Sequence, residues 1–502
     1  MVLSELRNAA NAIVPPNKLP PELLRVIFFY LCPGARRHDQ ERERERGPPY
    51  TNLLAASRVC RHWRDIAVSA PELWTQIILA PRTDLPAEEE ISIARLCMSR
   101  SGVRPLDFFC LRPDFPEELI PDRRPLRSLV YGYRAWKKFG DKLASFLPTE
   151  SCLERLEIRG EASSAIARCT HWPNNPFGSL TSLNLIYQRD IDANIYSLLD
   201  ALRCFPHLEE LLLETDYRPH PEPQHPPERS VLTIPLHSLK RMHICRVSVG
   251  TTGRLLRALD LLPNRVFMRF TNVSTDLGSI FPEGVAPGVS PCAATKIELV
   301  YPSTGGVILH ATNGGVYTRL AYQYFSRHSK PLNWIAERPG YSLKELWLHI
   351  DQVVTHYVGP PPHTMCDLET LVIETVHGSF YSTFFLMLSP DEDGVPYPLL
   401  STLELRNVFS VKAFGNVLKA RSDAGFRLRT LRIRWLDGCE ARTAPLAQFV
   451  DELDFYHVTD NKTSRGLELP GECMAGGKWW EPWSRDFTGG TEWQFCDYPE
   501  EW

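Results

Sequence analysis

Apolar residues recur with helical spacing in the segment LPPELLRVIFFYL, residues 19–31. A proline at position 20 or 21 suits the first turn of a helix, because the N–H that proline lacks would have no partner there. The positions that follow at i, i+3, i+4, i+7 and i+8 form one apolar stripe, made up of Leu23, Val26, Ile27, Tyr30 and Leu31. Leu24 and Phe28 widen the stripe, so the pattern predicts a short helix with more than one apolar side.

The same spacing returns in residues 53–74, LLAASRVCRHWRDIAVSAPELW. Its apolar positions, which predict a second helix, are Ala56, Val59, Cys60, Trp63, Ile66 and Ala67. Pro71 ends this helix, and Leu73 and Trp74 are available to pack. The segment 33–52 between the two predicted helices contains the run ERERER. We interpret this insertion as a solvated loop or, alternatively, as a second partner contact.

A short apolar template, L-x-x-L-x-L, repeats along the rest of the chain with a period of about 27 residues. Clear copies begin at Leu126, Leu153, Leu180, Leu208, Leu239, Leu343, Leu368, Leu400 and Leu428, and weaker copies lie near residues 265, 294 and 317. Each copy predicts one strand, and stacked copies predict a parallel sheet. Helical periodicity between the copies predicts connecting helices, including residues 194–205, 251–262 and 445–455. This pattern is typical of leucine-rich repeats in a horseshoe-shaped solenoid.

Residues that alternate with the inward template positions are predicted to line one face of this sheet. They are Arg155, Glu157, Arg159, Glu210, Glu214, Arg241, His243, Glu345, Trp347, His349, Glu404, Arg406, Arg432 and Arg434. Plain solvated surface explains most of them. An exposed Trp347 between Glu345 and His349 instead indicates an interface anchor, so we predict target binding by Glu345, Trp347, His349, Arg432 and Arg434.

Three segments depart from the repeat. Residues 305–317 alternate apolar and polar around Asn313–Gly314, which predicts a β-hairpin. Residues 217–231 are proline-rich and carry His220 and His225, for which a metal site is the minor alternative to a loop. The tryptophan-rich end, residues 471–502, is interpreted as a cap over the last repeat or as an exposed peptide for a partner.

Composition narrows the class of protein. A net charge of −4 disfavours recognition of nucleic acid or anionic membrane by bulk charge. We expect no membrane partner, because no apolar run approaches the roughly 18 residues that cross a bilayer. The 13 cysteines show no C-x-x-C pair, and the first residues lack a signal-peptide layout, so we expect a reduced protein of the cytoplasm or nucleus. Motifs for catalysis, nucleotides or metals are absent from the sequence, and we therefore expect no enzyme activity and no cofactor.

Cys60, His62 and Trp63 lie almost side by side and invite three interpretations. Residues two apart on a helix face different directions, which disfavours both a metal site and a thiol activated by histidine. Packing of Cys60 and Trp63 on one helix face is favoured, within the chain or against another molecule.

The order of these features resembles the F-box family, whose pattern runs LPxELLxxIFxYL, then LxxxSxVCxxW, then PxLW. The matching residues are Leu19, Pro20, Glu22, Leu23, Leu24, Ile27, Phe28, Tyr30, Leu31, Leu54, Ser57, Val59, Cys60, Trp63, Leu73 and Trp74. The insertion 33–52 departs from the family, which joins these helices through a few residues. The resemblance implies a three-helix module that docks on the adaptor Skp1 and so joins a cullin–RING ubiquitin ligase. Its implied contacts are Leu19, Pro20, Leu23, Leu24, Ile27, Leu31, Val59, Cys60 and Trp63.

An F-box followed by irregular repeats is similar to the leucine-rich-repeat F-box proteins, notably a group abundant in mushroom-forming (basidiomycete) fungi. The expected α/β architecture is a tail (1–14), a small helical F-box module (15–80), a leucine-rich-repeat solenoid with a parallel sheet (81–470) and the tryptophan-rich end (471–502). The expected function is a substrate receptor of an SCF-type ligase, with an unidentified target. The alternatives are an Skp1-binding or free-standing scaffold and, from another class, an enzyme whose site assembles from scattered His and Glu. The main hypothesis requires that Ile27, Val59 and Trp63 are not enclosed by the rest of the chain.

Overall fold

The computed structural model describes residues 14–31, 49–79, 86–110, 125–132, 152–159, 177–186, 191, 195–215, 233–260, 266–271, 294–301, 306–312, 317–322, 342–350, 365–375, 388–391, 394–406, 411–435 and 444–457. The chain divides into two compact units, Met1–Arg218 with Ala475–Pro482, and Pro219–Met474 with Trp483–Trp502. The insertion up to residue 48, the proline-rich segment 217–231 and the tryptophan-rich end 471–502 lie outside the described residues.

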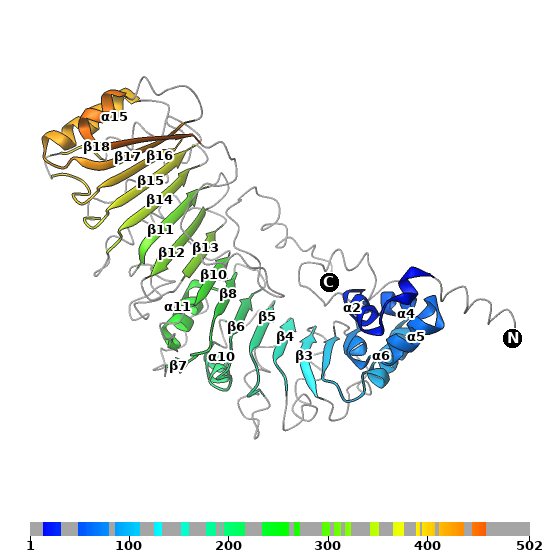
Figure 1. Cartoon of the computed structure of the whole chain (residues 1–502). Coiled ribbons are helices and arrows are strands. Elements are labelled where there is room, and N and C mark those ends of the chain that lie inside the picture. Colours follow the sequence, from blue (N-terminus) through cyan, green and yellow to red (C-terminus); the bar gives the residue numbers. More distant parts are fainter. Residues whose placement is uncertain are drawn as a thin grey trace, which may run out of the picture. The chain divides into compact units, whose positions relative to one another are not determined.

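The first unit begins with short helices (Figure 1), which are η1 (Pro15–Lys18), α2 (Pro21–Leu31), α4 (Pro49–Val59), α5 (Arg61–Val68), η3 (Pro71–Trp74) and α6 (Ala87–Ser101). Helix α4 begins at Pro49, so the predicted insertion 33–52 extends too far by four residues. The two predicted helices of this region are confirmed in part, because the second is interrupted and forms α4 and α5.

The interruption lies at Cys60, whose backbone is extended, with φ −156° and ψ 172°. Its Sγ accepts a hydrogen bond from the backbone N–H of Trp63 at 3.5 Å, the arrangement of a helix N-cap. The prediction of one continuous helix through Cys60 was therefore wrong. Apolar spacing continues across the break, and spacing alone does not reveal a capping residue.

Six strands of the first unit pair in parallel in the order of the sequence. They are β1 (Gln76–Leu79), β2 (Leu106–Cys110), β3 (Leu126–Tyr131), β4 (Arg155–Arg159), β5 (Ser182–Ile186) and β6 (Glu210–Glu214), with helix α10 (Ile195–Leu202) between the last two. The leucines at the second position of the L-x-x-L-x-L template pair in register on neighbouring strands and are buried. They are Leu129, Leu156, Leu183 and Leu211. Strands β1 and β2 were not predicted, because QIIL and LDFFC lack the template.

The strands of the second unit form a sheet in the order β8 (Arg241–Cys245), β10 (Phe267–Thr271), β13 (Tyr317–Tyr322), β12 (Gly306–Thr312), β11 (Ala294–Tyr301), β14 (Glu345–Ile350), β15 (Thr370–Thr375), β16 (Thr402–Arg406), β17 (Leu428–Trp435) and β18 (Val450–His457). The short strands β7 (Ile234–Pro235) and β9 (Leu259–Asp260) pair separately. The described helices are α11 (Val249–Ala258), α15 (Val411–Asp423) and η6 (Ala444–Phe449).

One strand runs against the others. Strand β12 pairs antiparallel with both β11 and β13, so the expectation of a wholly parallel sheet was wrong here. The predicted hairpin is confirmed, since β12 and β13 flank Asn313–Gly314. Pairing of β17 with β18 also corrects the predicted helix at residues 445–455, which forms η6 and then a strand. Leu453 and Phe455 alternate along that strand, and pairing with β17 outweighs the local helical spacing.

Candidate partner-binding surfaces

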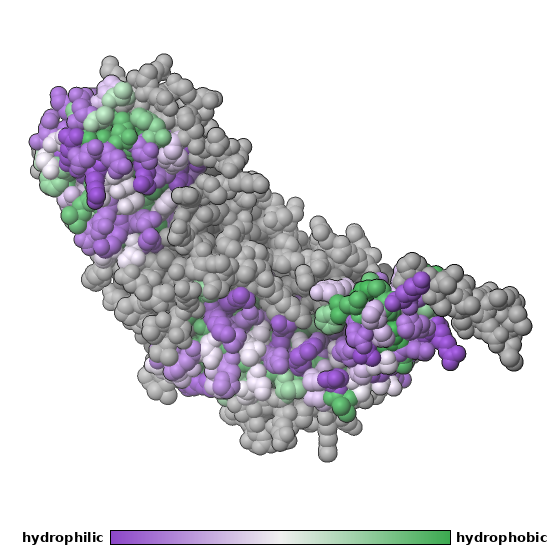
Figure 2. All heavy atoms as spheres, in the orientation of Figure 1, coloured by the Kyte–Doolittle hydropathy of each residue, from purple (hydrophilic) through white to green (hydrophobic). Residues whose placement is uncertain are grey.

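Helix α2 has apolar residues on two sides, and only one of them is enclosed. Leu24 and Phe28 have no exposed surface and form the inner side. Leu23, Val26, Ile27 and Tyr30 are 50%, 50%, 40% and 79% exposed on the other side, which we call the α2 ridge. Phe29 is also exposed beside it. Figure 2 shows a green patch of hydrophobic residues over α2.

The predicted Skp1 contacts fall into three groups of exposure. Exposed positions are Pro20, Leu23, Ile27 and Val59; half-buried positions are Leu19, Leu31 and Trp63. Leu24 and Cys60 are buried within the helices, so their effect on a partner would be indirect. The main hypothesis required that Ile27, Val59 and Trp63 are not enclosed by the rest of the chain. Ile27 and Val59 are exposed. Trp63 is half-buried and packs against Phe28, with the ring centroids 5.3 Å apart. Among the exposed apolar residues of α2, Phe29 lies outside the stripe that the sequence pattern predicted.

The Cys60 thiol has structural partners. Besides accepting from the Trp63 N–H, its Sγ lies 3.8 Å from Oδ1 of Asn17, which ties the junction of α4 and α5 to η1. His62 is exposed on the first turn of α5. Within the described ranges no group of three metal-ligating side chains occurs. Cys60 therefore serves as a helix cap rather than as the helix-face residue that the spacing indicated.

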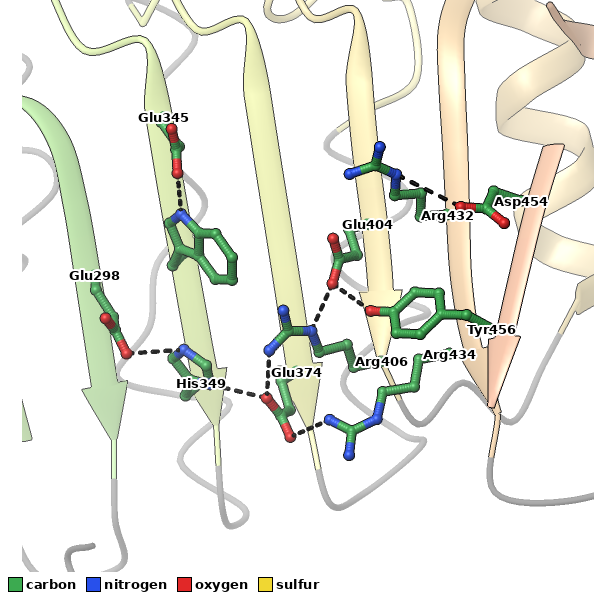
Figure 3. A network of polar contacts seen from close by, with 11 residues as sticks. Glu298, Glu345, His349, Glu374, Glu404, Arg406, Arg432, Arg434, Asp454 and Tyr456 are labelled. Carbon is green, nitrogen blue, oxygen red and sulfur yellow. Dashed lines mark hydrogen bonds and ion pairs between the residues drawn. The ribbon is translucent and has the colours of Figure 1, made fainter. Parts of the chain in front are cut away.

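Polar side chains cover one face of strands β11 and β14 to β18 in the second unit (Figure 3). Parallel register places them in rows, and one row contains His349, Glu374, Arg406, Arg434 and Tyr456. Of the predicted target-binding residues, His349 and Arg434 lie in this row, and Trp347 and Arg432 lie in the adjacent one. These side chains come from positions up to about a hundred residues apart in sequence, so no local motif could have joined them.

Trp347 is held from several sides. Its Nε1–H donates to Oε1 of Glu345 at 2.6 Å, and its ring stacks near that of His349, with centroids 6.4 Å apart and planes at 16°. The Arg406 guanidinium lies 5.0 Å from the Trp347 ring centroid, within the range of a cation–π interaction. The half-buried indole is thus fixed in one orientation on the sheet face.

His349 stands between two carboxylates from neighbouring strands. Its Nε2 lies 3.1 Å from Oε1 of Glu298 on β11, and its Nδ1 lies 3.1 Å from Oε2 of Glu374 on β15. Burial acts to lower the pKa of His349, but the two carboxylates outweigh it and raise that pKa above the ordinary value. The His349 side chain therefore links β14 to the neighbouring strands β11 and β15.

Glu374 is shared by three basic side chains. Besides His349, Arg406 donates from Nη1 to Oε2 of Glu374 at 3.2 Å, and Nη1 of Arg434 lies 3.6 Å from its Oε1. Burial alone would raise the pKa of Glu374, yet the charges and hydrogen bonds of His349 and Arg406 lower it to about 2. The carboxylate is ionised across the physiological range.

Arg406 and Tyr456 hold a second carboxylate, that of Glu404. Arg406 is almost completely buried and donates from Nε to Oε1 of Glu404 at 2.7 Å, while the Tyr456 hydroxyl donates to the same oxygen. Burial and then this hydrogen bond raise the pKa of Tyr456 to about 12. Arg432 and Arg434, with side chains 49% and 16% exposed, lie beside these groups on β17.

On the corresponding face of the first unit, the polar side chains of Glu157, Asn184 and Glu214 are buried. Glu157 has no exposed surface and accepts hydrogen bonds from Nε of Arg159 at 2.6 Å and from Nδ2 of Asn184 at 3.5 Å. The expectation of solvated surface was wrong at Glu157 and Glu214 in the first unit, and at Glu404 and Arg406 in the second, because all four are buried. In the second unit, by contrast, the Arg432 and Asp454 side chains are about half exposed.

Comparison with known families adds one match. The F-box-like family matches residues 16–80, the stretch that contains α2, α4, α5 and η3. No curated protein matches the chain. Across the described part of the chain, no helix is long and apolar enough to cross a membrane. The protein thus contains an F-box-like domain, a kind of domain that typically binds Skp1, followed by a mixed α/β body with parallel strands.

Proposed function

We propose that the protein is the substrate-receptor subunit of an SCF-type E3 ubiquitin ligase. In this proposal the F-box-like domain binds Skp1, which connects the protein to a cullin–RING ligase, and the body binds a target protein. The single observation that carries the proposal is the exposed α2 ridge inside the stretch that matches the F-box-like family.

The ridge is costly to leave in water. Fully burying one large apolar side chain is worth roughly 1.5–3 kcal/mol relative to exposure. Leu23, Val26, Ile27 and Tyr30 occupy one side of an 11-residue helix whose other side is already packed. Contiguous exposed apolar surface of this kind indicates a protein interaction site.

The body supplies the second half of the proposal. The repeated template and its parallel strands support a leucine-rich-repeat solenoid, and the polar face of β14 to β18 is the proposed target surface. The protein would contribute no catalytic group. It would hold the target near the ligase, which raises the effective concentration of the reacting groups. The proposed compartment is the cytoplasm or nucleus.

Co-expression of the full chain with Skp1 and a cullin, followed by purification through the chain, tests the proposal. Recovery of both partners supports the receptor role. Skp1 without cullin favours a scaffold that lacks a ligase role, and neither partner favours a free-standing repeat protein or an enzyme.

Variants locate the contact within the domain. Ile27→Asp and Val59→Asp should each abolish Skp1 recovery while leaving the fold intact, because both side chains are exposed. Val103→Asp is the matched control, since Val103 is 89% exposed just after helix α6 and outside the ridge. Equal recovery of Skp1 by all three variants would refute docking through the ridge.

A further inference from the structure

Two arginines of β17 share one face of the sheet. Arg432 and Arg434 are two residues apart on the strand, so their side chains leave the same face at points roughly 6.6–7 Å apart. Figure 3 shows both beside the network centred on Glu374. Two guanidinium groups at this spacing can reach one anionic group together.

Their ion pairs are loose compared with those of the neighbouring Arg406. The 3%-exposed Arg406 is held by Glu404 and Glu374 at 2.7 and 3.2 Å. In contrast, Arg434 is 3.6 Å from Glu374, and Nε of Arg432 is 3.8 Å from Oδ2 of Asp454. Both distances exceed those of an N–H···O hydrogen bond. Arg432 and Arg434 therefore keep N–H donors that no carboxylate of the described residues saturates.

The neighbouring carboxylates accept hydrogen bonds from residues other than Arg432 and Arg434. Glu374 already accepts from His349 and Arg406 through Oε2. Glu404 is occupied by Arg406 and Tyr456. Asp454 is half exposed and lies 3.8 Å from Nε of Arg432. An exposed ion pair of this kind contributes little and is screened by salt. An incoming anion would replace this weak pair with short charge-assisted hydrogen bonds.

We propose that Arg432 and Arg434 bind an anionic side-chain group, phosphoryl or carboxylate, on the target protein. The planar guanidinium fork matches both groups in a bidentate manner, and charge-assisted hydrogen bonds are roughly twice as strong as neutral ones. Glu374 and Asp454 hold the pair through the ion pairs at 3.6 and 3.8 Å. This inference rests on the proposed function, because it specifies the chemistry by which the body recognises a target.

The test uses the full chain purified with Skp1 and four fluorescein-labelled pools of nine-residue peptides. The pools are randomised except for a central phosphoserine, glutamate, serine or lysine, and binding is measured by fluorescence anisotropy at low salt. Phosphoserine or glutamate pools should bind at least tenfold more tightly than the serine and lysine pools. A phosphoserine pool that exceeds the glutamate pool identifies the phosphoryl group as the source, and equal binding identifies any carboxylate or phosphoryl group. Absence of a preference for the anionic pools, including no binding by any pool, overturns the inference.

Matched variants assign the preference to the pair. Arg432→Gln and Arg434→Gln should each weaken binding of the anionic pools about tenfold, since a hydrogen bond to a charged group is worth about one such factor or more. Arg429→Gln is the control, because Arg429 is exposed on the same strand but lies outside the two rows that contain Arg432 and Arg434. Unchanged binding by both pair variants overturns the inference. Skp1 recovery in the same samples separates the two proposals: its loss from the wild-type chain refutes the proposed function, and its retention without anion preference refutes only the role of the arginine pair.

Discussion

The ring of Phe28 on α2 lies 5.3 Å from that of Trp63 on α5, centroid to centroid, with the planes at 59°. Phe28 is enclosed, and Trp63 is half-buried. Tilted aromatic pairs at this distance add about 0.5–1.5 kcal/mol to the free energy of burial. The contact attaches one side of α2 to the rest of the domain and leaves the α2 ridge on the other side for a partner.

Phe28→Ala should therefore destabilise the F-box-like domain by about 3–5 kcal/mol, the usual cost of removing a buried phenylalanine. Hydrogen exchange of the amides of α2 and α5 in the full chain measures this effect without requiring two-state unfolding of the whole protein. Phe29→Ala is the matched control on the same helix, since Phe29 is 58% exposed, and it should change stability by less than about 0.5 kcal/mol. Equal losses of protection in the two variants would contradict this assignment of the inner side.

Cys60 should act through its capping hydrogen bond to the Trp63 N–H. Cys60→Ser keeps an acceptor at the N-cap and should preserve α5, whereas Cys60→Ala should cost about 1 kcal/mol of helix stability. The measurement is amide protection at the first turn of α5. If both variants lose protection to the same extent, the thiol contributes through packing and not as a cap.

Glu374 should make the second unit sensitive to acid. Its pKa of about 2 lies below the ordinary value of 4.5, so ionised Glu374 stabilises the folded state above pH 4.5, and this contribution disappears as the pH falls towards 2. The shift corresponds to about 3 kcal/mol. The free energy of unfolding, measured in urea between pH 2 and 6, should fall less steeply for Glu374→Gln than for the wild type.

Glu369→Gln is the control for that measurement. Glu369 lies just before β15 and forms an ion pair with Lys344 at 2.8 Å, but both side chains are about half exposed. A pair of this kind contributes about 0–1 kcal/mol, so its pH profile should follow the wild type. Parallel profiles for Glu374→Gln and the wild type would show that Glu374 is not the acid-sensitive group.

Arg421 should be essential for the turn that precedes β16. Its side chain is 1% exposed and donates from Nη1 to the carbonyl oxygens of Leu388 at 3.3 Å and Pro396 at 2.6 Å, and from Nη2 to that of Tyr397 at 3.0 Å. Burial lowers the pKa of Arg421 to about 10. Tyr397 has a left-handed backbone, with φ 50°, so these hydrogen bonds also hold a strained conformation.

Arg421→Met should therefore destabilise the second unit by about 3 kcal/mol, because it leaves three buried carbonyl groups without these donors. Urea denaturation measures the decrease in the free energy of unfolding of the second unit. Arg429→Met, at an exposed position, should have little effect. Similar stability of the two variants would mean that other donors replace the Arg421 guanidinium.

The sequence by itself determined the strands that carry the leucine template and the start of helix α2. Proline at the first helical position predicts the start of α2, and the clear copies of the template mark β3 to β6, β8 and β14 to β17. The Asn313–Gly314 hairpin was also predictable. These features depend on residues close together in the chain, so their physical causes, such as backbone restriction and alternation of side chains, can be read locally.

Only the tertiary structure decided which apolar side of α2 is enclosed, that β12 also pairs with β11, and that Glu157 is buried. It also decided that Glu298, His349 and Glu374 meet. Periodicity identifies apolar or polar positions but not the partner of each face, and the partner of His349 on β11 lies 51 positions earlier in the chain. Burial, ion pairing and the resulting pKa of Glu374 depend on distances between strands, and these distances exist only once the sheet has formed.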